Sequence, residues 1–340
     1  MNRAAWMLIL VVFLGSCGDK KTNDRDRFFL RGNAALSERS LADAIKFYSE
    51  AIKLDPNYAL AYNNRGIAYY EDDDLIAAVN DYSSAIRIDN QYFNAYQNRA
   101  NALQLLARYP EAISDLQKVV AVQPDSADVH FALGMAYEGN MQHEEALAAF
   151  TRSNELDPTN TETYLNMAVV YYHTGGLEEA DSLLRVSVET GNQNPNFYNI
   201  RGLVEVKKED LIAAVTIFDQ GMANYPENAY ILNNRGYVYL LMGNLELAAR
   251  DINESILLDP TNLWAYRNKG ILAYEQGDYS TAARLLNRAL DKKQYVEEVY
   301  AYLGLVSLAM DEKEKACEYF LLSTDRSELR GADAYQEHCQ

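Results

Sequence analysis

The 340-residue sequence is poor in the residue types that mark several special classes of protein. It has three Cys and four His, too few for a disulfide-rich scaffold or a dense metal site. Seven Pro and 17 Gly are too few for low-complexity linkers. Lys and Arg number 31 against 49 Asp and Glu, so the formal net charge is −18 at pH 7. An acidic protein repels phosphate groups, which argues against nucleic acid and against a membrane surface bound through a basic patch.

The composition supports a folded chain and gives no sign of catalysis. Hydrophobic residues make up 49% and charged residues 24%, so a sizeable core is available and a wholly disordered chain is excluded. No GxSxG motif or phosphate-binding glycine loop occurs, and His143 has no second histidine four residues later. The run Asp72–Asp74 lacks EF-hand spacing and is expected to form a solvated turn. We therefore expect no catalytic residue, no cofactor and no metal site.

The first residues indicate a secretory leader. Residues 4–14 form an apolar run of eleven, too short for a transmembrane helix of about 20 residues and suited to the core of a signal peptide. The segment 14–17, Leu-Gly-Ser-Cys, follows at once. A hydrophobe and two small residues before a cysteine resemble the lipobox of bacterial lipoproteins.

The lipobox resemblance implies cleavage before Cys17, a diacylglycerol on the Cys17 thiol and an acylated N-terminus, which makes residues 1–16 a signal peptide and residues 17–24 a lipidated tether. Stable anchoring needs more than one acyl chain, which agrees with this chemistry. Gly18 follows the cysteine, and the sorting rule of such lipoproteins then favours the outer membrane. We expect a lipid-anchored protein of the bacterial cell envelope, facing the periplasm or the cell surface. An ordinary secretory peptide with an incidental cysteine is the alternative.

Proline spacing shows an internal repeat. Pro56, Pro124, Pro158, Pro226 and Pro260 are separated by multiples of 34 residues. The chain divides without insertion or deletion into nine blocks of this length: 25–58, 59–92, 93–126, 127–160, 161–194, 195–228, 229–262, 263–296 and 297–330. The eighth residue of every block is Gly or Ala, and the twentieth is always Ala. The fourth is aromatic in seven of nine blocks, and the twenty-fourth is always a large apolar residue or Tyr.

The residue types within a block predict a pair of helices. Apolar residues recur at three- and four-residue spacing in each half, as an amphipathic helix requires. Pro at position 32 ends the second helix because proline cannot continue one. Gly or Ala at positions 8 and 20 lets the two backbones approach, and the large side chains at 4 and 24 fill the space beside them. One pair cannot bury both of its faces, so neighbouring pairs must stack.

This pattern resembles the tetratricopeptide repeat (TPR), which has an aromatic at position 4, Gly at 8, Ala at 20 and Pro at 32. The match covers residues 25–330. The resemblance implies an all-α fold, a right-handed α-solenoid superhelix of nine tandem helix hairpins. A short helix over Ala332–Cys339, within the C-terminal segment 331–340, is expected to cap the last hairpin because terminal repeats need a polar cover.

Position 7 departs from the leucine that is usual in the family. Arg or Lys stands there in six blocks, and three of these blocks have Asp at position 23. An arginine near a core is usually paired, so we expect ion pairs between the two helices of a hairpin. The expected pairs are Arg65–Asp81, Arg99–Asp115 and Arg235–Asp251. Binding of an acidic ligand by these arginines is the alternative.

Two cysteines remain if Cys17 carries lipid. In an oxidising envelope, Cys317 and Cys339 can form a disulfide that pins the capping helix. Two free thiols are the alternative.

The TPR resemblance also suggests where a partner binds. In the family, positions 2, 5, 9, 12 and 13 of the first helix face the concave side. Amides pair with peptide backbone and aromatic rings supply contact area, and both are frequent at these positions. The expected groove residues are Asn63, Tyr70, Gln97, Asn101, Tyr172, Asn199, Tyr230, Asn233, Tyr237, Trp264, Arg267 and Tyr274. The alternative is that Asn and Tyr are simply common on the surface of this chain.

These features predict a non-catalytic, lipid-anchored scaffold that holds a peptide or protein partner in its groove. By resemblance to bacterial TPR lipoproteins, its partners belong to envelope assembly, proteolysis or cell-wall machinery. No three consecutive repeats carry the Lys, Asn and Arg set of the carboxylate-clamp subclass, so a receptor for chaperone tails is not expected. Two alternatives remain open: a structural subunit that bridges complexes or forms a homodimer through its convex face, and a glycan-binding protein or enzyme.

Overall fold

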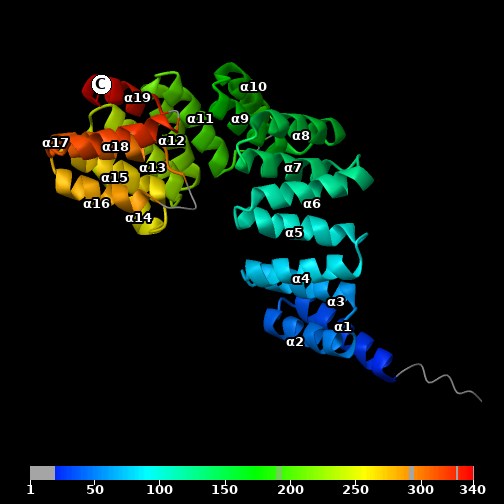
Figure 1. Ribbon diagram of the computed structural model, residues 1–340. Helices are drawn as coiled ribbons and strands as arrows, with labels where there is room; N and C mark the ends of the chain where they lie inside the picture. The colour runs from blue at the N-terminus through cyan, green and yellow to red at the C-terminus, as the bar shows by residue number, and fades with distance from the viewer. Residues whose placement is uncertain (1–19, 190, 192, 291–294, 327, 340) are drawn as a thin grey trace, which may run out of the picture. The chain divides into compact units, whose positions relative to one another are not determined.

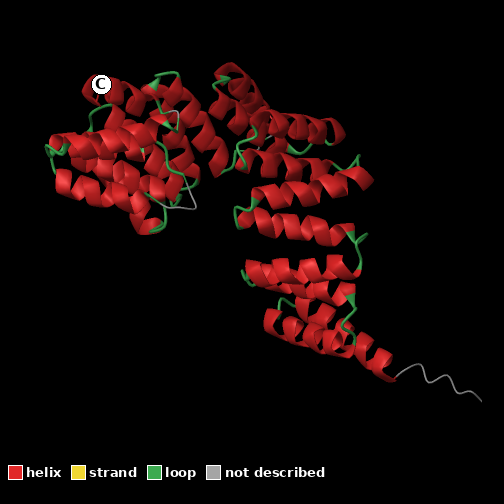
Figure 2. Cartoon of the chain, viewed as in Figure 1, coloured by secondary structure: helices red, strands yellow, loops and turns green. Residues whose placement is uncertain are grey.

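The computed structural model describes residues 20–339 apart from positions 190, 192, 291–294 and 327. These residues form 19 α-helices and no strand (Figure 2). The chain divides into two compact units, residues 1–142 and 143–340. The predicted signal peptide, residues 1–16, and the predicted lipidation site Cys17 lie outside the described residues.

Each unit is a series of helices joined by short turns (Figure 1). The helices of the first unit are α1 (Lys20–Ser37), α2 (Leu41–Leu54), α3 (Ala59–Glu71), α4 (Leu75–Ile88), α5 (Phe93–Leu105), α6 (Tyr109–Val122) and α7 (Ala127–Gly139). The helices of the second unit are α8 (His143–Leu156), α9 (Thr161–Thr174), α10 (Leu177–Glu189), α11 (Pro195–Lys207), α12 (Leu211–Asn224), α13 (Ala229–Leu241), α14 (Leu245–Leu258), α15 (Leu263–Glu275), α16 (Tyr279–Ala289), α17 (Val299–Ala309), α18 (Lys313–Thr324) and α19 (Leu329–Cys339).

The helix starts follow the 34-residue period. The even-numbered helices from α2 to α18 all begin at position 17 of their blocks. The odd-numbered helices from α3 to α15 begin at position 1, whereas α17 begins two residues later, at Val299. Within each unit, consecutive helices pack as hairpins and each hairpin packs on the next, as α2 does on α3 and α12 on α13. The predicted all-α fold of stacked TPR helix pairs is therefore confirmed within each unit.

A residue with left-handed backbone forms the turn inside each hairpin. Position 15 has a positive φ in all nine blocks, as at Ala107 (54°) and Gly175 (85°). Position 16 is the N-cap of the second helix, and the carboxylates of Asp74 and Asp210 accept a hydrogen bond from the backbone N–H three residues on. The run Asp72–Asp74 is therefore a turn that ends in a cap, as expected.

Within each unit, the core of a hairpin is a close approach between positions 8, 20 and 24. All nine alanines at position 20 are fully buried. A Cβ added at Gly202 would lie 2.3 Å from Cζ of Phe218, so the aromatic ring occupies the space that the glycine leaves. Where Ala168 stands at position 8, position 24 is the smaller Leu184. Gly at position 8 also faces Ile252 or Leu286 at position 24, so a large side chain fills the space beside the small residue in each of these hairpins.

The first and the last described helices are longer than predicted. Residues 20–24, predicted as a tether, are helical, because no Gly or Pro interrupts the segment and Asp24 pairs with Arg27 one turn later. Helix α19 begins three residues before the predicted start at Ala332. Among the described helices, none combines the length and the apolar character that crossing a membrane requires.

Candidate functional site

The arginines at position 7 are held within the protein. Nε and Nη2 of Arg99 donate to the two carboxylate oxygens of Asp115 at 2.7 and 2.8 Å, and Nη1 donates to Oγ of Ser83 in the preceding repeat at 2.9 Å. Similar contacts are made by Arg65 with Asp81 and Ser49 and by Arg235 with Asp251 and Asp219. The three predicted ion pairs are confirmed, and their geometry assigns these arginines a structural role. The contact with the residue at position 25 of the preceding repeat was not predicted. The polar residue at that position was the available signal for it.

Three asparagines predicted to line a groove are engaged by the neighbouring repeat. Position 6 of one repeat donates to position 5 of the preceding one at 2.8–3.0 Å, from Asn98 to Asn63, from Asn234 to Asn199 and from Asn268 to Asn233. Asn63 and Asn233 are only 3% and 2% exposed. The structure therefore places these two in the contact between first helices rather than on an open surface, because their amides satisfy one another there.

The other predicted groove residues differ in exposure. In the first unit, partly exposed side chains on α3 and α5 are Tyr70, Gln97 and Asn101. In the second unit, the half-buried aromatics are Tyr172, Tyr237, Trp264 and Tyr274, while Tyr230 is exposed. Arg267 is buried, with 8% of its surface exposed. We call the surface formed by α9, α11, α13, α15 and α17 the inner face of the second unit, since these first helices pack side by side.

A hollow lies on the inner face between α9 and α11. It is lined by Glu162, Leu165, Asn166, Val169, Asn196, Asn199 and Ile200. Three of these residues are aliphatic and three are amides, so the hollow offers apolar contact together with hydrogen-bonding groups. Nδ2 of Asn194 donates to Oε1 of Glu162 at 2.8 Å and holds that carboxylate at the edge of α9.

Aromatic and cationic side chains from several first helices gather elsewhere on the inner face. The guanidinium of Arg267 (α15) lies 4.7 Å from the ring centroid of Tyr237 (α13). Nζ of Lys207 (α11) lies 4.1 Å from the ring centroid of Tyr172 (α9). The charges of Arg267 and of Glu298, at the start of α17, also act on Tyr172. Side chains of α9 and α11 therefore meet at Tyr172, those of α13 and α15 meet at Arg267, and charges of the second group act on Tyr172.

The tyrosines of this cluster remain neutral. Burial raises the pKa of Tyr172 and of Tyr237, and it raises the pKa of Tyr302 to about 12. For Tyr172 the charge of Glu297 acts in the same direction and raises the pKa further. Protonated hydroxyls both donate and accept hydrogen bonds, so the inner face presents adaptable polar groups beside its ring surfaces.

The capping helix adds a residue that sequence analysis missed. Arg330 in α19 lies over the ring of Tyr302 at 4.9 Å, and its Nε donates to Oε1 of Glu298 at 3.1 Å. The second oxygen of Glu298, Oε2, accepts from Nη1 of Arg267 at 3.4 Å. Arg330 is the last residue of the ninth block, and the repeat pattern assigns no role to that position. A basic residue just before the expected cap was the only signal in the sequence.

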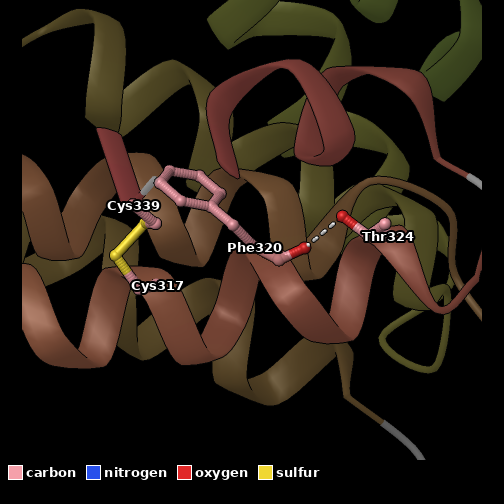
Figure 3. Close-up of a disulfide and its surroundings, with 4 residues drawn as sticks. All are labelled: Cys317, Phe320, Thr324 and Cys339. Atoms are coloured by element: carbon pink, nitrogen blue, oxygen red, sulfur yellow. Dashed lines mark hydrogen bonds between the residues drawn. A yellow bond between two sulfur atoms is a disulfide. The ribbon is translucent and has the colours of Figure 1, made fainter. Parts of the chain in front are cut away.

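A disulfide joins Cys317 of α18 to Cys339, the last residue of α19, with Cα atoms 5.7 Å apart (Figure 3). Cys339 packs against the small core around Phe320, which is fully buried. Near the start of α19, Oε1 of Glu328 accepts a hydrogen bond from the backbone N–H of Glu298 at 2.7 Å. The cap is therefore held at both of its ends.

The histidines make packing contacts. His143 and His173 stack with ring centroids 6.1 Å apart, and Nε2 of His130 lies 2.9 Å from the carbonyl oxygen of Pro124. Within the described ranges, no three His, Cys, Asp or Glu side chains are grouped in a way that suits a metal ion.

Family models of the tetratricopeptide repeat match most of the helical region. A model described as a TPR repeat matches residues 32–73. Models described as tetratricopeptide repeats match residues 98–161 and 267–321, residues 139–203, and residues 229–262. The chain therefore belongs to the TPR family, whose members typically act as scaffolds for protein–protein interaction rather than as catalysts.

Solved structures with the same fold come from diverse sources. Cut9–Hcn1, an APC/C hetero-tetramer, is similar over 93% of this chain and 76% of its own, with 16% identity and a TM-score of 0.61. PilF of Pseudomonas aeruginosa is similar over 62% of this chain and 96% of its own, with 20% identity and a TM-score of 0.51. A tetratricopeptide repeat protein from Parabacteroides merdae is similar over 84% of this chain and 99% of its own, with 16% identity and a TM-score of 0.51. At these identities the similarity shows the fold alone.

Proposed function

We propose that this protein is a lipid-anchored TPR scaffold of the bacterial envelope that holds an extended segment of a partner polypeptide on the inner face of its second unit. The observation that carries the proposal is the combination of surfaces on that face. The hollow between α9 and α11 supplies aliphatic and amide groups, and the neighbouring cluster supplies neutral tyrosines. Apolar contact with a few convergent polar groups is the usual make-up of a binding site.

The proposed lipid anchor is supported by the lipobox at residues 14–17 and by the disulfide near the C-terminus. The Cys317–Cys339 disulfide suits the oxidising side of a membrane, where a lipoprotein of this kind functions. The partner is then a protein of the envelope, in assembly, proteolysis or cell-wall machinery. The role proposed for the inner face is binding without catalysis, in keeping with the TPR family.

Site-specific photo-crosslinking tests the binding surface. A benzoylphenylalanine at Asn196, which is exposed and lines the hollow, is expected to form a discrete adduct with a partner in intact cells. The matched control is the same probe at Ile212 on α12, which is 74% exposed and lies outside the hollow. Replacing Tyr237 and Trp264 by Ala is expected to reduce the Asn196 adduct. Adducts at Ile212 alone, or equal adducts at both positions, would contradict the proposal.

A separate experiment tests the anchor. Cys17→Ser is expected to release the protein from the membrane fraction and to abolish incorporation of labelled palmitate. Retention in the membrane with unchanged labelling would show that Cys17 is not the lipidated residue.

A further inference from the structure

We propose that Arg330 of the capping helix and Arg267 of α15 form a site for a carboxylate of the partner polypeptide. The proposal rests on the function above and specifies the chemistry of the partner. The site lies at one end of the inner face and includes a residue of the capping helix α19. It therefore differs from a site built only from equivalent positions on the first helices of consecutive repeats.

Two guanidinium groups share one carboxylate, because Glu298 accepts from Arg330 at 3.1 Å and from Arg267 at 3.4 Å. Lys207 adds a third positive charge near Tyr172, and Glu297 and Glu328 are further acids close to Glu298. Glu298 is therefore the single acceptor for two cations in a protein whose net charge is −18. An incoming carboxylate supplies the second acceptor that these guanidinium groups lack.

The guanidinium of Arg330 is oriented before any ligand arrives. Nε is held by Glu298, one face of the group lies over the Tyr302 ring, and 43% of the side chain is exposed. Nη1 and Nη2 donate no hydrogen bond to any described residue. These two nitrogens form a planar fork that matches the two oxygens of a carboxylate.

Arg267 is incompletely paired although only 8% of its surface is exposed. Its Nε has no hydrogen-bond partner among the described residues, and its contact with Glu298 is long. A buried cation with too few partners carries a desolvation cost that a second anion offsets. Arg267 therefore favours negative charge in the cluster, while the exposed Arg330 makes the direct contact.

Contacts at both ends of the cap fix the position of Arg330. Glu328, just before α19, accepts hydrogen bonds from the backbone of Glu298 and from the Ser323 hydroxyl, so the start of the cap is tied to the same glutamate that holds Arg330. The disulfide fixes the far end of α19. The cap is thus a rigid support that presents Arg330 to the inner face.

Selection from a random library tests the proposal. Twelve-residue peptides displayed with free C termini are panned against the detergent-solubilised full-length protein and against Arg330→Gln. Peptides selected by the wild type are expected to be enriched in Asp or Glu, and Arg330→Gln is expected to lose this enrichment. Selected peptides are then synthesised with Asn and Gln in place of their acids, and with free or amidated C termini, to distinguish a side-chain carboxylate from a terminal one.

Affinities of the synthetic peptides complete the test. Arg330→Gln is expected to weaken binding of the acidic peptide about tenfold or more, as loss of a charged hydrogen bond does. Arg330→Lys keeps the charge but lacks the planar fork of donors. Its affinity for the acidic peptide is expected to lie between those of the wild type and of Arg330→Gln. The matched control is Arg326→Gln, which removes an exposed arginine that also lies over tyrosine rings, at 4.8 and 5.1 Å, and is expected to leave affinity unchanged.

The outcomes separate this inference from the proposed function. Selected peptides without acids, or acidic peptides bound equally by Arg330→Gln, overturn the carboxylate site and leave the peptide-binding role intact. Selection of no peptide by the wild type, together with no crosslink at Asn196, overturns both.

Discussion

The first helices bury arginine in two different ways, at position 7 and at position 5 of the repeat. Arg99 of the first unit makes three hydrogen bonds to Asp115 and Ser83, so its charge and its donors are satisfied by the scaffold. Arg267 of the second unit is more deeply buried, yet its ion pair with Glu298 is long, its guanidinium lies over the Tyr237 ring, and its Nε has no hydrogen-bond partner among the described residues. The same residue type thus holds the hairpins together in one case and leaves unused binding capacity in the other. The degree of pairing, rather than the residue type, distinguishes a structural arginine from a candidate binding residue.

The largest effect is expected at Arg99, whose hydrogen bonds are all made within the scaffold. Asp115→Ala leaves Arg99 without its counter-ion, and we expect a loss of stability on the order of 3 kcal/mol in urea unfolding. The control is Asp219→Ala in the second unit, whose side chain is 54% exposed and whose loss is expected to cost about 1 kcal/mol or less. Equal effects of the two substitutions would remove the distinction between buried and exposed pairs.

The next largest effect concerns the disulfide at the C-terminal end of the second unit. The disulfide joins residues separated by 22 positions, and its removal in a double Cys317→Ser, Cys339→Ser variant is expected to cost about 3 kcal/mol. Hydrogen exchange should speed up in α18 and α19 and stay unchanged in the first unit, because repeats contact only their neighbours. Unchanged exchange in α19 would show that non-covalent contacts suffice to hold the cap.

A smaller effect tests what the two units share. Ala112 in the first unit and Ala248 in the second are both fully buried at position 20. Replacing either one by Leu overpacks the helix crossing and is expected to cost about 1–3 kcal/mol. A lowered thermal midpoint in both variants is expected, and an unchanged midpoint in either would contradict the common core.

The smallest effect is expected at Arg267, whose Nε has no hydrogen-bond partner among the described residues. Arg267→Met removes a buried charge and leaves Glu298 with Arg330, so the free protein is expected to change by about 1 kcal/mol or less, in either direction. Arg99→Met is the comparison, because it strands Asp115 and is expected to be clearly destabilising. Urea unfolding measures both variants, and a large loss for Arg267→Met would assign that residue to the scaffold.

The contacts that the 34-residue period determines could be predicted from the sequence. A constant register places positions 7 and 23 of one hairpin opposite each other, so the spacing between Arg99 and Asp115 was sufficient to predict their pairing. The same register predicted the buried alanines at position 20. These features depend only on contacts within one hairpin, and each hairpin repeats the same geometry.

The features that sequence analysis missed depend on contacts between repeats or outside them. Asn63 is chemically suited to a peptide backbone and to another amide alike, and only the packing of α3 against α5 shows that Asn98 engages it. Arg330 acquires a partner because α17 starts late and Glu298 adopts a left-handed backbone with φ of 62°. Neither departure from the period is encoded by a recognisable motif.

The invariant start of the second helices has a consequence for how such a chain can change in length. One extra residue inside a helix rotates everything after it by about 100°, which would turn the buried alanine of that hairpin toward solvent. Growth or shortening by complete 34-residue modules preserves every contact between neighbours. The reach of this protein is therefore adjustable only in whole modules, while the cap with its disulfide has to remain at the end.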